Sequence, residues 1–366
     1  MNRSLNCWSR VCRTLIFACW ATTLSAGGVT SVFADESGNG EPETIPTGVE
    51  ILGIRTWPEQ VELRAPWDVA QLLITGEIES GQQIDLTRMA TCTSASDVVS
   101  VDEGGRIRPL RNGQQALSFE VAGRTASVVV TVNGMTDPGP VSFVRDVAPG
   151  LSKMGCNSGT CHGAKDGQRG FKLSLRGYDF QYDHRALTDD SAARRFNRAN
   201  PDQSLMLLKA SGSVPHVGGM LTRPGDRHYE LIRKWIASGA QLDSQTTKVA
   251  SIELLPHNPI LPRESLNQQM VVIATYADGS QRDVTADAFI ESGNIEVLSA
   301  NKRGVVHALR RGEAPILARY EGAYTATTIT IMGDRSGFVW EAPPTNNYID
   351  ELVYNKLQRV KIAPSG

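Results

Sequence analysis

Two stretches of the chain carry the same alternation of apolar and polar residues. In the first, IDLT at 84–87 is followed by GRIRPLRNG at 105–113. In the second, RDVT at 282–285 is followed by GVVHALRRG at 304–312. The first landmark recurs after 198 residues and the second after 199. This nearly constant internal spacing predicts one module that is used twice.

Each copy has the pattern of a small antiparallel sandwich. Its apolar runs are short and β-branched, are separated by Gly, Asp or Asn, and end on an alternating strand, at 126–132 and 326–331. The sequence YADGS at 276–280 places Asp-Gly between two β-favouring runs, which predicts a hairpin turn. We therefore expect all-β sandwiches over residues 49–135 and 250–333.

The segment between the copies, residues 140–242, has a helical period instead. Val147, Leu151 and Met154 fall at i, i+4 and i+7, which predicts a short helix that leads into Cys156. Three further apolar residues alternate like a short buried strand: Phe171, Leu173 and Leu175. The segment is expected to form a small, mainly α domain.

A second helix is predicted near the end of this segment, from Arg227 to Ser238. Asp226 stands where an N-cap is expected, and Gly239 stands where the helix would end. Its apolar residues form one stripe: Leu231, Ile232, Trp235 and Ile236.

The two ends of the chain differ from the middle. Residues 1–34 have a basic start, a short apolar run and small residues before Asp35, which predicts a cleaved export signal. An uncleaved membrane anchor is the alternative, although the apolar run is only about half of the roughly 20 residues that a spanning helix needs. Residues 35–48 are polar and rich in Gly and Pro, which predicts a linker.

The composition indicates which kind of partner and which cellular compartment to expect. A net charge of −2 argues against nucleic acid as a partner. Removal of the signal would leave Cys92, Cys156 and Cys161, which are too few for a disulfide scaffold. The export signal predicts a location in the periplasm, at the cell envelope or outside the cell. No spacing of Ser, His, Asp or Glu indicates a catalytic constellation, so enzyme activity stays open.

The stretch CNSGTCH at 156–162 is the strongest chemical signal. Two cysteines with a histidine directly after the second are typical of covalent haem c, with Cys156 and Cys161 as attachment points and His162 as proximal iron ligand. Four residues separate the cysteines where the usual motif has two, so the loop must bulge. A Cys156–Cys161 disulfide and a zinc site or free thiols are the alternatives.

A second iron ligand is expected from the Gly-rich stretch before the last helix. His216, in VPHVGG, is the preferred candidate, because Pro and Gly flanks favour a loop that presents the ring. Met220 is the alternative, four residues further on. Histidine at this position would lower the reduction potential relative to methionine.

The motifs resemble two known families in a consistent order. Asp278-Gly279-Ser280, Asp283-Val284-Thr285 and the run 304–312 are similar to group 2 bacterial Ig-like domains. The run 155–163, with GFKLSLRGYD at 170–179 and the surroundings of His216, resembles the cytochrome c-like region of large planctomycete-type exported proteins. In that family a further domain of unknown function follows. Residues 336–366 of this chain resemble the start of that domain.

The resemblance implies two Ig-like sandwiches that flank a small cytochrome c-like domain. The expected function is single-electron transfer through one haem c, with an unidentified redox protein as partner. The alternative is a non-redox cell-surface or adhesion-type protein, with a Cys156–Cys161 disulfide and Ig-like domains that bind a glycan or a protein.

Overall fold

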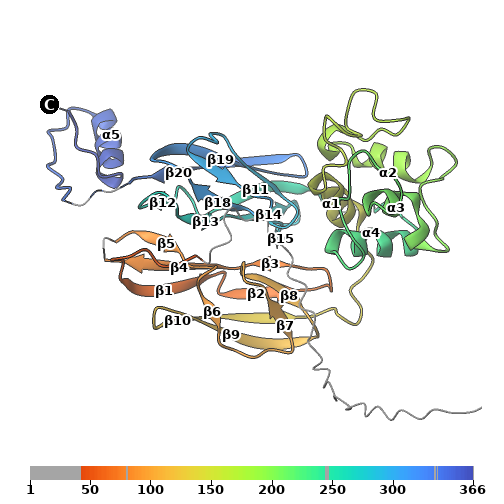
Figure 1. Ribbon diagram of the computed structural model, residues 1–366, viewed down its shortest axis with the longest axis horizontal. Helices are drawn as coiled ribbons and strands as arrows, with labels where there is room; N and C mark the ends of the chain where they lie inside the picture. The colour runs from red at the N-terminus through yellow and green to blue at the C-terminus, as the bar shows by residue number, and fades with distance from the viewer. Residues whose placement is uncertain (1–42, 80, 244–246, 334, 336, 366) are drawn as a thin grey trace, which may run out of the picture. The chain divides into compact units, whose positions relative to one another are not determined.

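The computed structural model describes residues 43–79, 81–243, 247–333, 335 and 337–365. The predicted export signal and residues 35–42 of the predicted linker lie outside these ranges. The described chain is mostly β-sheet, and along the sequence a helical segment lies between its two sets of strands (Figure 1). Within the described ranges, no helix combines the length and apolar character that crossing a membrane requires.

The two sets of strands have the same order. In the first set the sheets are β1-β4-β5, β2-β10-β9-β6 and β3-β8-β7, and in the second they are β11-β14-β15, β12-β20-β19-β16 and β13-β18-β17. In each set one pair is parallel, β2 with β10 and β12 with β20. The sequence repeat is therefore a repeat of fold, and the two expected sandwiches are present.

The strand bounds of the first sandwich are β1 (Ile51–Trp57), β2 (Gln60–Leu63), β3 (Ala70–Gln71), β4 (Leu73–Ile78), β5 (Gln83–Asp85), β6 (Thr91–Cys92), β7 (Val99–Val101), β8 (Arg106–Pro109), β9 (Gly113–Val121) and β10 (Arg124–Val132). Those of the second are β11 (Val249–Leu255), β12 (Ile260–Leu261), β13 (Asn267–Gln269), β14 (Val271–Tyr276), β15 (Gln281–Asp283), β16 (Phe289–Ser292), β17 (Leu298–Ala300), β18 (Val305–Ala308), β19 (Gly312–Tyr320) and β20 (Ala323–Ile331).

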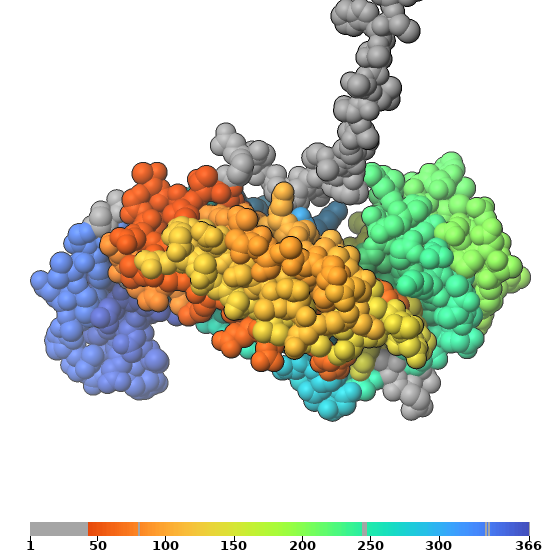
Figure 2. Space-filling model, turned by 90° about the horizontal axis from the view of Figure 1, so that it is seen from below, coloured from red at the N-terminus to blue at the C-terminus, as the bar shows by residue number. Residues whose placement is uncertain are grey.

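The alternation of side chains places the core between the sheets. On β10, Val128, Val130 and Val132 are fully buried, whereas Val129 between them is 37% exposed. Ile329 and Ile331 on β20 are buried in the same way. Because successive strand residues point to opposite faces, every second side chain enters the core. The outward side of the first sandwich is seen in orange and yellow in Figure 2.

The helical segment contains η1 (Phe143–Val147), α1 (Ala148–Lys153), η2 (Leu175–Gly177), α2 (Phe180–Thr188), η3 (Pro201–Gln203), α3 (Leu205–Ala210) and α4 (Arg227–Ala237). Its core is built around Trp235 of α4, whose ring centroid lies 5.0 Å from that of Phe143 and 5.3 Å from that of Phe196. The two predicted helices correspond to α1 and α4.

Two local expectations for this segment are wrong. Phe171 makes only an isolated bridge with Gln168, and Leu175 is 47% exposed, so no buried strand forms there. Asp226 occupies the N-cap of α4, but its carboxylate accepts the N–H of Arg223, 2.7 Å away, and not an N–H of the helix. A preceding turn competes for this carboxylate. Beyond β20, α5 (Tyr348–Arg359) is amphipathic and has no buried residue.

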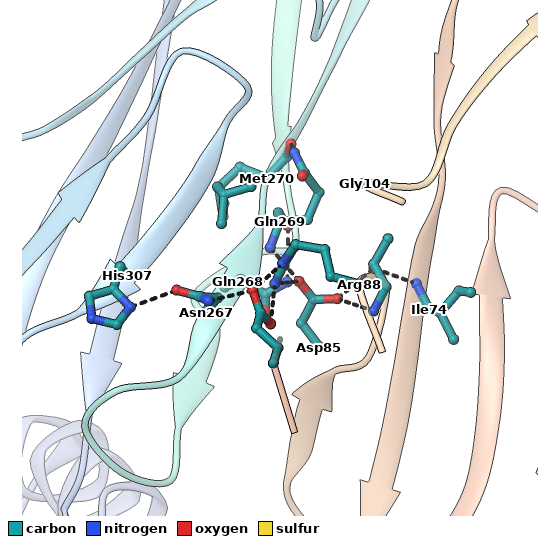
Figure 3. A network of polar contacts seen from close by, with 12 residues as sticks. Ile74, Asp85, Arg88, Gly104, Asn267, Gln268, Gln269, Met270 and His307 are labelled. Atoms are coloured by element: carbon teal, nitrogen blue, oxygen red, sulfur yellow. Dashed lines mark hydrogen bonds and ion pairs between the residues drawn. The ribbon is translucent and has the colours of Figure 1, made fainter. Parts of the chain in front are cut away.

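The two sandwiches are joined by a reciprocal pair of hydrogen bonds. The Asp85 carboxylate accepts the backbone N–H of Gln269 at 2.6 Å, and the Asp283 carboxylate accepts that of Gln71 at 2.5 Å. Asp85 also holds Arg88 at 2.9 Å (Figure 3). The two aspartates occupy the same place in the repeat, and so do the two glutamines. The pairing is therefore isologous, like that of a two-fold dimer.

Two arginines tie the helical segment to both sandwiches. Arg227 donates to the Trp67 carbonyl at 2.8 Å and, through both terminal nitrogens, to Asp287 at 2.5 and 2.9 Å. Arg282, from the second sandwich, lies 3.0 Å from Asp146 of the helical segment and 3.9 Å from Asp68 of the first sandwich. Arg227 of the helical segment thus contacts both sandwiches. Arg282 of the second sandwich contacts the helical segment and the first sandwich.

A buried carboxyl group lies where the helical segment meets the β19–β20 turn. Glu321 has its Oε1 atom buried with no hydrogen-bond partner among the described residues, as have Tyr276 Oη and Arg145 Nε. The Arg145 guanidinium lies 4.4 Å from the Tyr276 ring centroid. Burial raises the pKa of Glu321 to about 7.

We expect Arg227→Met to destabilise the protein by about 3–5 kcal/mol, because among the described residues it leaves only the His228 side chain paired with the buried Asp287 carboxylate. The urea midpoint measures the change. Arg111→Met is the matched control, since Arg111 makes a similar two-nitrogen pair with Asp97 at side-chain exposures of 56% and 73%. It should cost at most about 1 kcal/mol. Equal effects of the two substitutions would contradict the role of burial.

Stability should fall as pH rises from about 5 to 8, because the raised pKa of Glu321 makes ionisation harder in the folded protein than in the unfolded chain. The stabilising effect of the neutral acid is complete below pH 4.5 and is lost as pH passes about 7. Between pH 5 and pH 8 the free energy of unfolding should drop by on the order of 1–3 kcal/mol because of Glu321, and Glu321→Gln should remove this drop. Urea midpoints at the two pH values measure the change. Glu59→Gln, at an exposed carboxylate, should leave the drop in place.

Candidate functional site

The cysteine loop is closed by its own backbone. Helix α1 ends at Lys153, and Gly155, at a φ of 80°, turns the chain out of it. The N–H of His162 then donates to the Cys156 carbonyl at 3.0 Å, and the N–H groups of Cys161 and Gly163 both donate to Ser158, each at 3.0 Å. These bonds absorb the two additional residues in a compact turn, so that the first cysteine and the histidine meet.

Gly163 is required by this turn. A Cβ atom at Gly163 would lie 2.1 Å from the Asn157 carbonyl oxygen. Asn157 is itself buried, its side-chain amide donates to Ser152 at 2.7 Å, and its carbonyl accepts the N–H of Arg176 at 2.9 Å. The loop is therefore attached both to α1 and to η2.

Both loop cysteines are free thiols, so the Cys156–Cys161 disulfide is not formed in the structure. Cys156 packs against the helical core. Burial, with a smaller contribution from Cys161, raises the pKa of Cys156 to about 12. Its thiol is therefore protonated at neutral pH. Cys92 lies apart in β6, packed against the core of the first sandwich.

His162 is held in one tautomer. Its Nδ1 lies 3.0 Å from the Phe171 carbonyl oxygen, which can only accept a hydrogen bond, so Nδ1 carries the proton. The Phe171 ring lies against the imidazole, with centroids 4.5 Å apart. Burial lowers the pKa of His162 below 6.5, so the ring is neutral at pH 7 and Nε2 keeps its lone pair.

His216 has the same arrangement on the opposite loop. Its Nδ1 lies 3.0 Å from the Gly219 carbonyl oxygen. The centroid of its ring lies 6.4 Å from that of His162, and the two ring planes are within 6° of parallel. Neither Nε2 has a hydrogen-bond partner among the described residues. The structure thus brings together two residues that are 54 positions apart in the sequence.

Met220, the alternative ligand, has a different neighbour. Its sulfur accepts the Nε–H of Arg223 at 3.3 Å, and its side chain is 51% exposed. Val217, directly after His216 in the sequence, is 96% exposed, and Leu175 is 47% exposed. Leu175 would lie 3.7 Å from a Cβ atom on Gly159, in the middle of the cysteine loop.

The described residues contain no group of three or more His, Cys, Asp or Glu side chains that could hold a metal ion. The zinc alternative therefore has no ligand set there. An iron held in a porphyrin is a different case. It needs only two nitrogen ligands from the protein, because the porphyrin supplies the other four nitrogens.

Three residues that shape the site could not be recognised from the sequence pattern. The carbonyls of Phe171 and Gly219 fix the two tautomers, but every residue has a carbonyl. Arg195 is 8% exposed, donates to the Ala186 and Asp190 carbonyls and lies 4.2 Å from the Phe171 ring centroid. It thereby supports the ring on which His162 rests.

No protein-family model and no curated protein matches the chain. Among solved structures, the S-layer protein SbsC domains 4 and 5 match 24% of this chain and 53% of that chain, at 10% identity and a TM-score of 0.21. SbsC domains 5-6 match 78% and 99%, at 10% identity and 0.29. Human protocadherin-24 EC1-2 matches 78% and 100%, at 6% identity and 0.17. The chain thus spans about half of the first of these, and TM-scores this low support no inference about function.

We expect Gly163→Ala to open the cysteine loop, because its Cβ atom would collide with the Asn157 carbonyl. The thermal midpoint should fall, and the protein should react faster with a thiol reagent at Cys156. Gly159→Ala is the matched control in the same loop, since its Cβ would make only an ordinary contact with Leu175. Similar behaviour of the two variants would contradict the proposed closure of the loop.

Proposed function

We propose that this chain is an exported haem c-binding protein that transfers single electrons. The observation that carries the proposal is the parallel pair formed by His162 and His216. A metal–imidazole bond of roughly 2 Å and a ring radius of roughly 1.2 Å, set by bonds of about 1.35 Å, would place two imidazoles on one metal with centroids about 6.4 Å apart. The measured centroid separation is 6.4 Å, and binding of one metal requires both Nε2 atoms to turn toward the space between the rings.

The hydrogen bonds of the two rings support the same proposal. Metal-bound histidines almost always donate their second ring N–H to a carbonyl, carboxylate or water. His162 does so to Phe171, and His216 to Gly219. Both Nε2 atoms are thereby left as acceptors for a metal.

The remaining parts of the site fit a porphyrin. Cys156 and Cys161 would hold it through thioethers, and the exposed side chains of Val217 and Met220, close in sequence to His216, would be available for apolar contact with it. Contiguous exposed apolar side chains commonly mark a binding surface. When bound, haem supplies a one-electron iron couple, and a second histidine in place of methionine sets its potential lower.

A second candidate is a non-redox cell-surface protein. It is favoured by the share of the described chain that two Ig-like sandwiches occupy, since such modules are suited to spacing and to adhesion. On this view the sandwiches bind a glycan or a protein, and the helical segment is a rigid connection. Free Cys156 and Cys161 thiols do not support the disulfide of this alternative.

We expect the full chain, made in a host that matures c-type cytochromes, to be coloured and to show a pyridine haemochrome spectrum of haem with two thioethers. Cys156→Ser with Cys161→Ser should remove the covalent haem. Cys92→Ser is the control and should keep it. A colourless product, in a host that matures another c-type cytochrome in the same experiment, would rule out the redox function and favour the surface protein.

The ligand assignment has its own test. His216→Ala should convert a low-spin, six-coordinate spectrum to a high-spin one, while the haem stays attached. His216→Met should restore the low-spin state at a higher potential. A low-spin spectrum unchanged by His216→Ala, and lost in Met220→Ala, would move the assignment to Met220.

A further inference from the structure

A cavity of about 180 Å³ lies where the helical segment meets the second sandwich. The helical segment contributes Arg176 and Phe180 to its wall, and the second sandwich contributes Phe289, Arg319 and Glu321. Sites for drug-sized ligands usually have about 300–1,000 Å³, so this cavity suits a smaller molecule. None of the candidate haem ligands lines it, and what it binds is therefore a question separate from the proposed function.

Three cations in the wall have no acidic partner. They are Arg176, Lys248 and Arg319, and none of them forms an ion pair with a carboxylate of the described residues. Burial, and next the nearby charge of Arg176, lower the pKa of the Arg319 guanidinium below its usual range. The two guanidiniums thus repel each other, and an anion bound between them would relieve the repulsion.

The two acidic residues in the wall do not cancel this positive charge. The Asp287 carboxylate is already held by Arg227 at 2.5 Å and by His228 at 3.0 Å. Burial raises the pKa of Glu321 to about 7, so this side chain is only partly ionised at neutral pH. Its Oε1 atom is the one that is buried with no hydrogen-bond partner among the described residues. The cavity therefore combines a net positive charge with an unused polar group.

Two aromatic rings of the wall hold two of the cations. The Arg319 guanidinium carbon lies 4.4 Å from the Phe289 ring centroid, and the Lys248 ammonium nitrogen lies 5.1 Å from that of Phe180. A guanidinium stacked on a ring keeps the N–H donors at its edge available, and these can bind a carboxylate through two parallel hydrogen bonds. The positions of both cations thus suit the capture of an anion.

The third cation, Arg176, stands on an unusual backbone. Its φ of 60° lies in the left-handed region, which residues other than glycine rarely adopt. The conformation is held by its own N–H, which donates to the Asn157 carbonyl at 2.9 Å. Backbone strain of this kind is concentrated at binding sites. Here it occurs at a residue that supplies one of the unpaired charges of the cavity.

We propose that this cavity binds a small organic anion of the dicarboxylate class. Its unpaired cations match two carboxylates, and the rings of Phe180 and Phe289 suit the short hydrocarbon that joins them. Neutral Glu321 can donate its O–H to a carboxylate oxygen of the ligand. The ligand would contact both the helical segment and the second sandwich. Because the unfolded chain has no such cavity, binding should stabilise the fold.

The test is isothermal titration calorimetry of the full chain with sodium succinate at pH 7 and constant ionic strength. Succinate should bind saturably and raise the thermal midpoint. Succinamide has the same shape without the charges and should bind at least about tenfold more weakly, because charge-assisted hydrogen bonds are lost. Inorganic phosphate that binds as tightly as succinate would overturn the dicarboxylate assignment in favour of an inorganic anion.

Two substitutions locate the binding. Arg319→Met and Arg176→Met, made separately, should each weaken succinate binding about tenfold or more. Arg176 is exposed, so its variant should fold normally, which the thermal midpoint without succinate verifies. Arg263→Met is the matched control, at an exposed arginine of the same sandwich outside the cavity, and should leave the affinity within about twofold. No saturable binding of succinate, or equal weakening by all three substitutions, would overturn the proposal.

Discussion

The buried carboxylate of Asp287 is the point on which the arrangement of the described chain depends. It is 3% exposed and is held by two nitrogens of Arg227 and by His228. Such a charge is stable away from water only with its partners in place, and they strongly lower the pKa of its carboxyl group. The first turn of α4 is thereby fixed to the second sandwich, and Arg227 fixes it to the first sandwich through the Trp67 carbonyl.

Packing contacts connect helix α4, which Asp287 holds in place, to the candidate site. The His228 ring would lie 3.0 Å from a Cβ atom on Gly150, so α1 and α4 approach closely there. Helix α1 leads directly into Cys156. His162 and His216 each have their Nδ1 atom 3.0 Å from a backbone carbonyl oxygen. A ligand pair held this way loses little freedom when a metal binds, because both tautomers are already fixed.

The contact between the two sandwiches depends on the internal repeat. Asp85 and Asp283 are equivalent in the repeat, and each satisfies a backbone N–H of the other copy. The face that carries the repeated aspartate is therefore used for pairing inside the chain. A partner of either sandwich would have to bind at another surface. The same local motif thus has one role in the fold of each copy and a second role between copies.

The sequence alone determined what depends on neighbours along the chain: the repeat and its strands, the hairpin turn at Tyr276, helices α1 and α4, and the cysteine motif. Periodicity and turn residues act over a few positions. Only the tertiary structure decided that the rings of His216 and His162 lie parallel, that Arg195 is buried, that Leu175 is exposed and that Asp226 serves a turn. These outcomes depend on packing between distant segments, where desolvation and competing hydrogen-bond partners override local preference. Periodicity along the chain carries no information about them.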